Sequence, residues 1–161
     1  MKRRFSHRIV RLIKDCGGTN MIEAAIIAPI MLVLTFSIVD FASMFYVYLA
    51  LENGVSQATR YAVTGNQLQD PNNPSATLSR QDSIILTMQR ATPTLTINSS
   101  AFSFSHLVGT SWTSGLGGSG DVGKVTVTYT WNIMTPLIRP FFTNGQIQFT
   151  VASAMKNETY Q

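Results

Sequence analysis

The chain has 161 residues and a formal net charge of +4 at pH 7, so it can build one modest domain. Six of its twelve Lys and Arg residues lie within the first fourteen positions. From Thr19 onward, six basic residues face seven acidic ones, which excludes a basic surface for nucleic acid in that part. Cys16 is the single cysteine, which excludes an intramolecular disulfide.

A long apolar segment follows the basic cluster. The run from Ala24 to Val39 contains no charged residue, and apolar residues continue beyond Asp40 to Leu51. A bilayer core needs about 20 helical residues, which this segment supplies when Asp40 lies near the far interface. The basic residues place the preceding end in the cytoplasm and the rest of the chain across the membrane. A cleaved secretory signal is the alternative, but its apolar region is usually shorter and ends in a small-residue cleavage site.

The apolar segment belongs to one predicted helix from Thr19 to about Ala62. Pro29 lies inside it and should bend the helix or loosen its first turns, because proline removes a backbone hydrogen bond. Further along, Phe41, Phe45 and Tyr48 recur at helical spacing, next to Tyr46. They fit either an aromatic belt at the outer interface or a packing face for a soluble domain.

The remaining residues predict a small head. Residues 63–78 are rich in turn formers and indicate a linker loop. Ser79 and Asp82 resemble a capping box for a short helix from Arg80 to Arg90. Apolar and polar residues then alternate, which predicts strands, and Asn144-Gly145 marks a turn before the last one. The predicted strand residues are Leu95, Ile97, Phe102, Phe104, Val125, Val127, Tyr129, Trp131, Ile147, Phe149 and Val151.

The predicted fold class is therefore α+β, with a long N-terminal membrane-spanning helix, an antiparallel sheet and a short helix. The expected parts are a basic cytoplasmic leader (1–18), a transmembrane and stalk helix (19–62), a linker loop (63–78) and a periplasmic head (79–161).

No pattern in the head predicts catalysis. The segment from Gly115 to Lys124 has the glycine and lysine spacing of a phosphate-binding loop, but Val125 occupies the place of the magnesium-binding Ser or Thr. A strand is expected to follow this loop, where the motif requires a helix. His106 is the only histidine beyond the leader, so a nitrogen or sulfur metal site is not expected. We expect no catalytic residue, no metal and no cofactor.

Glu23 stands where the apolar segment begins. A carboxylate entering hydrocarbon costs roughly 2.5–3.5 kcal/mol, which makes such a residue a functional hypothesis. If the chain were cut after Gly18, Thr19 would become the amino terminus and Glu23 would lie about one helical turn away. Glu23 could then pair with the free α-amine of a neighbouring subunit and set the register between helices. The alternative is a plain signal anchor whose glutamate reaches the cytoplasmic interface.

Residues 17–62 resemble a type IV prepilin-like protein and, more narrowly, a TadE-like protein of the tight-adherence (Flp) pilus system. Five features carry the resemblance. They are Gly18 followed after four residues by Glu23, then Ala24 and Ala25, Pro29, "IVDFASMFYVYLAL" (Ile38 to Leu51) and "ATRYA" (Ala58 to Ala62). The family often has an aromatic residue directly after the glutamate, where this chain has Ala24.

The resemblance implies a non-enzymatic minor pilin or pseudopilin, cut by a prepilin peptidase between Gly18 and Thr19. Its partners would be that peptidase, other pilin or pseudopilin subunits, inner-membrane pilus assembly proteins and the lipid bilayer. It would cross the bacterial inner membrane once, with the head in the periplasm, or enter an extracellular pilus. The alternatives are an unprocessed signal-anchored structural protein, a signal-anchored periplasmic enzyme, or an exported peptide cut after a double glycine.

Overall fold

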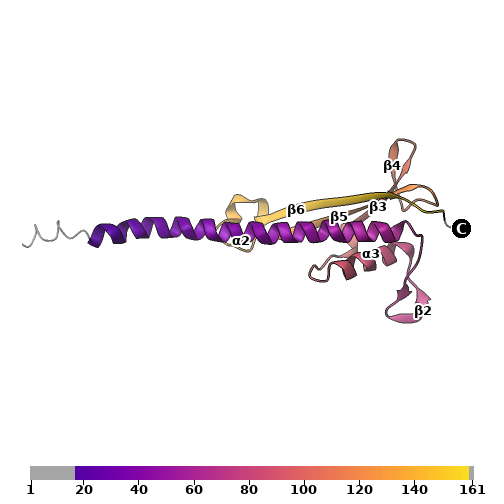
Figure 1. Cartoon of the computed structure of the whole chain (residues 1–161), viewed down its shortest axis with the longest axis horizontal. Helices are drawn as coiled ribbons and strands as arrows, with labels where there is room; N and C mark the ends of the chain where they lie inside the picture. The colour runs from indigo at the N-terminus through magenta and orange to yellow at the C-terminus, as the bar shows by residue number, and fades with distance from the viewer. Residues whose placement is uncertain (1–16, 160–161) are drawn as a thin grey trace, which may run out of the picture.

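The computed structural model describes residues 17–159 and consists of one long helix with a head built along its C-terminal half (Figure 1). The helix, α2, runs from Gly17 to Ala62. The other elements are β1 (Gln69–Asp70), β2 (Asn73–Thr77), α3 (Arg80–Ala91), β3 (Phe102–Val108), β4 (Ser111–Ser114), β5 (Val122–Asn132) and β6 (Gln146–Lys156), with short 3-10 turns at Ser99–Ala101, Arg139–Phe141 and Thr143–Gly145. The predicted α+β class is confirmed. Residues 1–16, which hold the basic cluster and Cys16, lie outside the described residues.

The head contains a four-stranded antiparallel sheet in the order β4-β3-β5-β6. Its longest pairing joins β5 and β6, from Val122 opposite Lys156 to Asn132 opposite Gln146. The residues between these two strands, 133–145, form a connection that we call the junction loop. Asn144 and Gly145 in this loop have φ values of 55° and 63°, so the predicted turn before the last strand is present.

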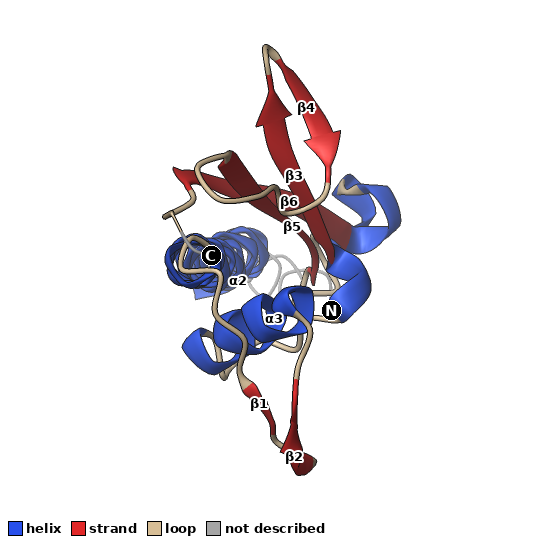
Figure 2. Cartoon of the chain, turned by 90° about the vertical axis from the view of Figure 1, so that its right-hand side faces the viewer, coloured by secondary structure: helices blue, strands red, loops and turns tan. Residues whose placement is uncertain are grey.

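The C-terminal half of α2 supplies one side of the core. Its buried apolar residues recur every three or four positions, which is the spacing of one helix face. They are Val47, Leu51, Val55, Ala58 and Ala62. Viewed along its axis, α2 has the sheet on one side and α3 on the other (Figure 2). Val125 and Val127 of the sheet and Ile84 and Met88 of α3 are at most 2% exposed, so both neighbours complete the same core.

Helix α3 begins at the predicted capping box. The Ser79 side chain accepts a hydrogen bond from the Asp82 backbone N–H at 3.1 Å, and its hydroxyl donates to Asp82 Oδ2 at 2.6 Å. These bonds satisfy one of the free N–H groups at the helix start. The helix continues to Ala91, one residue beyond the expected end.

The expected strand at Leu95 and Ile97 is wrong. The chain turns after α3 as the Leu95 N–H donates to the Thr92 carbonyl at 3.0 Å. The Ile97 carbonyl accepts a hydrogen bond from the Gln89 side chain of α3 at 3.1 Å. Its partner is therefore a helix side chain and not the backbone of a neighbouring strand. Ile97 is nevertheless 3% exposed, which explains why its position follows an apolar pattern.

Two short pairings add to the predicted elements. Residues 63–78 contain the β1–β2 hairpin as well as loop segments. Strand β4 pairs with β3 through four residue pairs, from Val108 opposite Ser111 to Ser105 opposite Ser114.

Gly54 lies where α2 packs tightly against the C-terminal end of α3. A Cβ atom at this position would lie 2.6 Å from Thr92 Cγ2 and 3.2 Å from Met88 Cγ. Such distances are far below van der Waals contact, so only glycine lets the two helices lie this close.

We therefore predict that Gly54→Leu lowers the free energy of unfolding by about 1–3 kcal/mol through overpacking. Unfolding in detergent, followed by the fluorescence of the head tryptophans, measures this. Gln57→Leu introduces the same side chain on an exposed position of the same helix and should change stability by less than about 0.5 kcal/mol. Equal losses for the two variants would contradict the close crossing.

Candidate functional site: the exposed half of α2 and its junction with the head

The N-terminal half of α2 extends beyond the head and is uncovered (Figure 1). Every residue from 18 to 32 is exposed. The large apolar side chains of this part are Met21, Ile22, Ile26, Ile27, Ile30, Met31 and Leu32, each at least 49% exposed. An apolar 18-residue window in α2 has none of its residues buried, and it is the one candidate membrane span among the described residues. The helix has the length and surface of a membrane anchor.

The predicted processing and assembly residues lie at the start of this half. Gly18 and Thr19 are in the first turn of α2, and Glu23 follows on the exposed surface. Among the described residues, a Cβ atom added to Gly18 would meet no other group within 4 Å. Packing within residues 17–159 therefore does not require glycine at position 18. The helix continues through Pro29 without interruption, and the bend expected there stays a prediction.

Asp40 joins the exposed half of α2 to the head. It is 3% exposed, and it is the only acidic residue among the buried ones in the described chain. Its Oδ1 accepts from the Met134 backbone N–H and its Oδ2 from the Thr135 backbone N–H, both at 3.1 Å. Both carboxylate oxygens therefore hold the junction loop against the helix. We call this pair of hydrogen bonds the Asp40 clasp. The apolar pattern predicted Asp40 near the far interface of the membrane, but no pattern in the sequence indicated these two hydrogen bonds.

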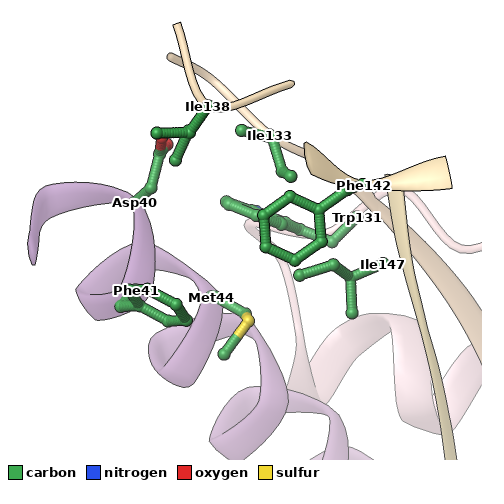
Figure 3. Close-up of a pocket in the computed structure, with 8 residues that line it drawn as sticks. All are labelled: Asp40, Phe41, Met44, Trp131, Ile133, Ile138, Phe142 and Ile147. Carbon is green, nitrogen blue, oxygen red and sulfur yellow. The ribbon is translucent and has the colours of Figure 1, made fainter. Parts of the chain in front are cut away.

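Apolar side chains surround the clasp. Figure 3 shows Asp40 and Met44 on α2 facing Trp131, Ile133 and Phe142 of the sheet and junction loop. The space between them is about 10 Å³, which is the lower limit for a single water molecule. The junction is thus a packed contact and has no room for a small-molecule ligand.

The four aromatic residues between Phe41 and Tyr48 were expected either at the membrane interface or on a face that packs against the head, and the structure shows both kinds of surroundings. Tyr48 is half-buried and packs edge-on against Phe149 of β6, with ring centroids 5.9 Å apart. Phe41, Phe45 and Tyr46 are 48–59% exposed. Tyr48 therefore belongs to the packing face, whereas the exposed rings are available to a membrane interface.

The glycine-rich segment in the head makes its hydrogen bonds within the chain. The Gly117 carbonyl accepts from Arg80 at 2.9 Å, and the Gly118 carbonyl accepts from the buried Asn157 amide at 2.8 Å. The Gly118 N–H, which a phosphate loop would offer to its ligand, donates to Asp121 at 2.7 Å. Lys124 lies 4.0 Å above the Trp112 ring. These contacts agree with the interpretation of a loop before a strand.

His106 lies on β3, and its Nδ1 is 3.3 Å from the Gly115 carbonyl oxygen. Among residues 17–159, no group of three or more His, Cys, Asp or Glu side chains could hold a metal ion.

Comparison with known proteins identifies a family for the helix. Residues 18–60 match the family model described as TadE-like protein, which confirms the resemblance over nearly all of α2. No curated protein and no solved structure matches the chain. The head, apart from the part of α2 it contains, lies outside the matched residues.

We predict that Asp40→Ala frees the junction loop. The two backbone N–H groups are partly buried and lose their acceptors, so the head should lose at most about 1–3 kcal/mol of stability and the amides of Met134 and Thr135 should exchange hydrogen faster. Hydrogen exchange at these two amides in detergent checks this. Glu52→Ala removes an exposed carboxylate from the same helix and should leave both amides protected. Unchanged exchange in Asp40→Ala would refute the clasp.

Proposed function

We propose that the protein is a minor pilin or pseudopilin of a Tad (Flp) pilus system. In this proposal α2 crosses the bacterial inner membrane once, with its N-terminus in the cytoplasm and the head in the periplasm. The TadE-like match at residues 18–60 supports a pilin-like protein associated with such a pilus. The observation that carries the proposal is the division of α2 into an exposed apolar half, which bears Gly18 and Glu23, and a half with one face buried in the head.

The exposed half needs another apolar environment. Burial of one large aliphatic side chain is worth about 1.5–3 kcal/mol, and this half presents at least seven of them. Water would therefore be a poor solvent for it. A lipid bilayer covers such a surface before assembly, and the helices of other pilin subunits cover it within a filament.

The residues at the start of α2 fit the same proposal. Cleavage by a prepilin peptidase between Gly18 and Thr19 would create a free amine on Thr19. Glu23, one turn further along, would then pair with such an amine on a neighbouring subunit. Because an unpaired carboxylate in an apolar bundle is costly, this pairing would favour one register between helices.

The head would supply the specific contacts of this subunit. Our hypothesis is that it acts at the pilus tip or in priming assembly, because it is too large for a simple major subunit of this pilus class. Affinity purification of the full chain from cells that express the pilus system tests this. Recovery of no pilus component would contradict an assembly role.

We predict that the mature protein extracted from membranes begins at Thr19 and that Gly18→Ala blocks this processing. Since a methyl group at position 18 meets nothing within 4 Å in the part of the chain that the structure describes, loss of cleavage would report peptidase recognition and not misfolding of that part. N-terminal sequencing gives the answer directly. An intact Met1 in the wild-type protein would favour an unprocessed, signal-anchored structural protein.

Glu23→Gln should leave cleavage unchanged but reduce the recovery of a second, differently tagged copy or of other pilins severalfold. Glu52→Gln, on the part of α2 within the head, serves as the matched control. Equal recovery with Glu23→Gln and wild type would remove the pairing role of Glu23.

A further inference from the structure

The junction loop concentrates the exposed apolar side chains of the head. In the described residues outside α2, five large apolar side chains are exposed, and three of them lie in this loop. They are Met134 at 68%, Leu137 at 58% and Phe141 at 82% exposed. The loop sequence "IMTPLIRPFFTNG" contains no acidic residue and one basic residue, Arg139. A loop of this composition is unusual for a surface that faces only water.

The loop lies at the end of the head that is nearest to the exposed half of α2 (Figure 1). The Asp40 clasp fixes its position along the helix. A shallow groove joins Met134 and Pro136 of the loop to Phe36 and Val39 of α2, and its lining is mostly apolar. The exposed surface of the loop is therefore continuous with the apolar surface of the helix.

The depth of the loop follows from helix geometry. Asp40 lies 17 residues after Glu23, or about 25 Å along the axis at about 1.5 Å per residue. A hydrocarbon core is about 30 Å thick. If Glu23 lies at the inner interface, Asp40 and the loop it holds lie within about 5 Å of the outer edge of the hydrocarbon.

The backbone of the loop is suited to such an environment. Hydrogen bonds within the described residues account for eight of its eleven N–H groups, and Pro136 and Pro140 have none to donate. The eight belong to Ile133, Met134, Thr135, Ile138, Arg139, Phe141, Phe142 and Gly145. Because unpaired backbone groups are costly in lipid, these bonds favour a position at the edge of the hydrocarbon and not deep within it. The Asp40 carboxylate contributes two of these bonds, so it neutralises polar groups that would otherwise be costly at this depth.

We propose that the junction loop is a lipid-binding element, seated in the outer leaflet beside α2, with Met134, Leu137 and Phe141 in contact with acyl chains. Arg139, the one basic residue of the loop, donates its Nε–H to the Ile133 carbonyl at 2.9 Å. This inference rests on the proposed membrane-spanning role of α2. It adds a second membrane contact, which fixes how the head is oriented on the bilayer.

Site-directed spin labelling tests the lipid contact. The full chain, with Cys16→Ser, is reconstituted at a low protein-to-lipid ratio in vesicles of phosphatidylethanolamine and phosphatidylglycerol. Leu137→Cys and Phe141→Cys carry the label in the loop. Val108→Cys is the matched control, because Val108 is 56% exposed but lies on β3 beside the β3–β4 turn. Ile30→Cys reports on the exposed half of α2.

The expected result is that oxygen, which concentrates in lipid, relaxes the labels at positions 137, 141 and 30 severalfold more than a water-soluble nickel chelate does. The label at 108 should show the opposite preference. A lipid signal at 30 with an aqueous signal at 137 and 141 would overturn the loop inference alone. Loop labels shielded from both reagents would also overturn it, in favour of a contact with a second copy. An aqueous signal at 30 would overturn the membrane span itself.

Discussion

The burial of the C-terminal half of α2 is the contact on which the rest of the structure depends. The sheet and α3 both pack on this half, through side chains such as Leu51 and Val55 that are at most 1% exposed. Without the helix, the buried faces of β5, β6 and α3 would have no common core. The head is therefore not an independent unit attached to an anchor, because the anchor helix forms the centre of its core.

Asp40 stands at the boundary between the two environments of this helix. Towards the N-terminus the surface is apolar and uncovered, and towards the C-terminus one face is buried in the head. A charge at this boundary would be costly in either apolar environment unless it were hydrogen-bonded. The carboxylate accepts hydrogen bonds from two backbone N–H groups of the junction loop. These bonds offset the cost of burying the charge, and they attach the head to the helix.

The features that local sequence determines were predictable. The long helix, the capping box at Ser79 and the strands with regular alternation each follow from nearby residues. The strand predicted at Leu95 and Ile97 is absent. Alternating apolar residues indicate burial, but they do not indicate whether a neighbouring strand is present to pair with. The short strands β1, β2 and β4 escaped prediction because two to five residues among turn formers carry little periodic signal.

The Asp40 clasp could not be predicted because its partners lie 94 and 95 residues further along the chain. The sequence does reveal that Asp40 is a carboxylate surrounded by apolar residues. A carboxylate in such a place requires a hydrogen-bond partner, and only the tertiary fold can supply it. Glu23 is also a carboxylate beside apolar residues, but it remains exposed on the uncovered half of α2. Asp40 thus finds its partners within the chain. The proposed pairing of Glu23 with a neighbouring subunit would meet the same physical need from outside the chain.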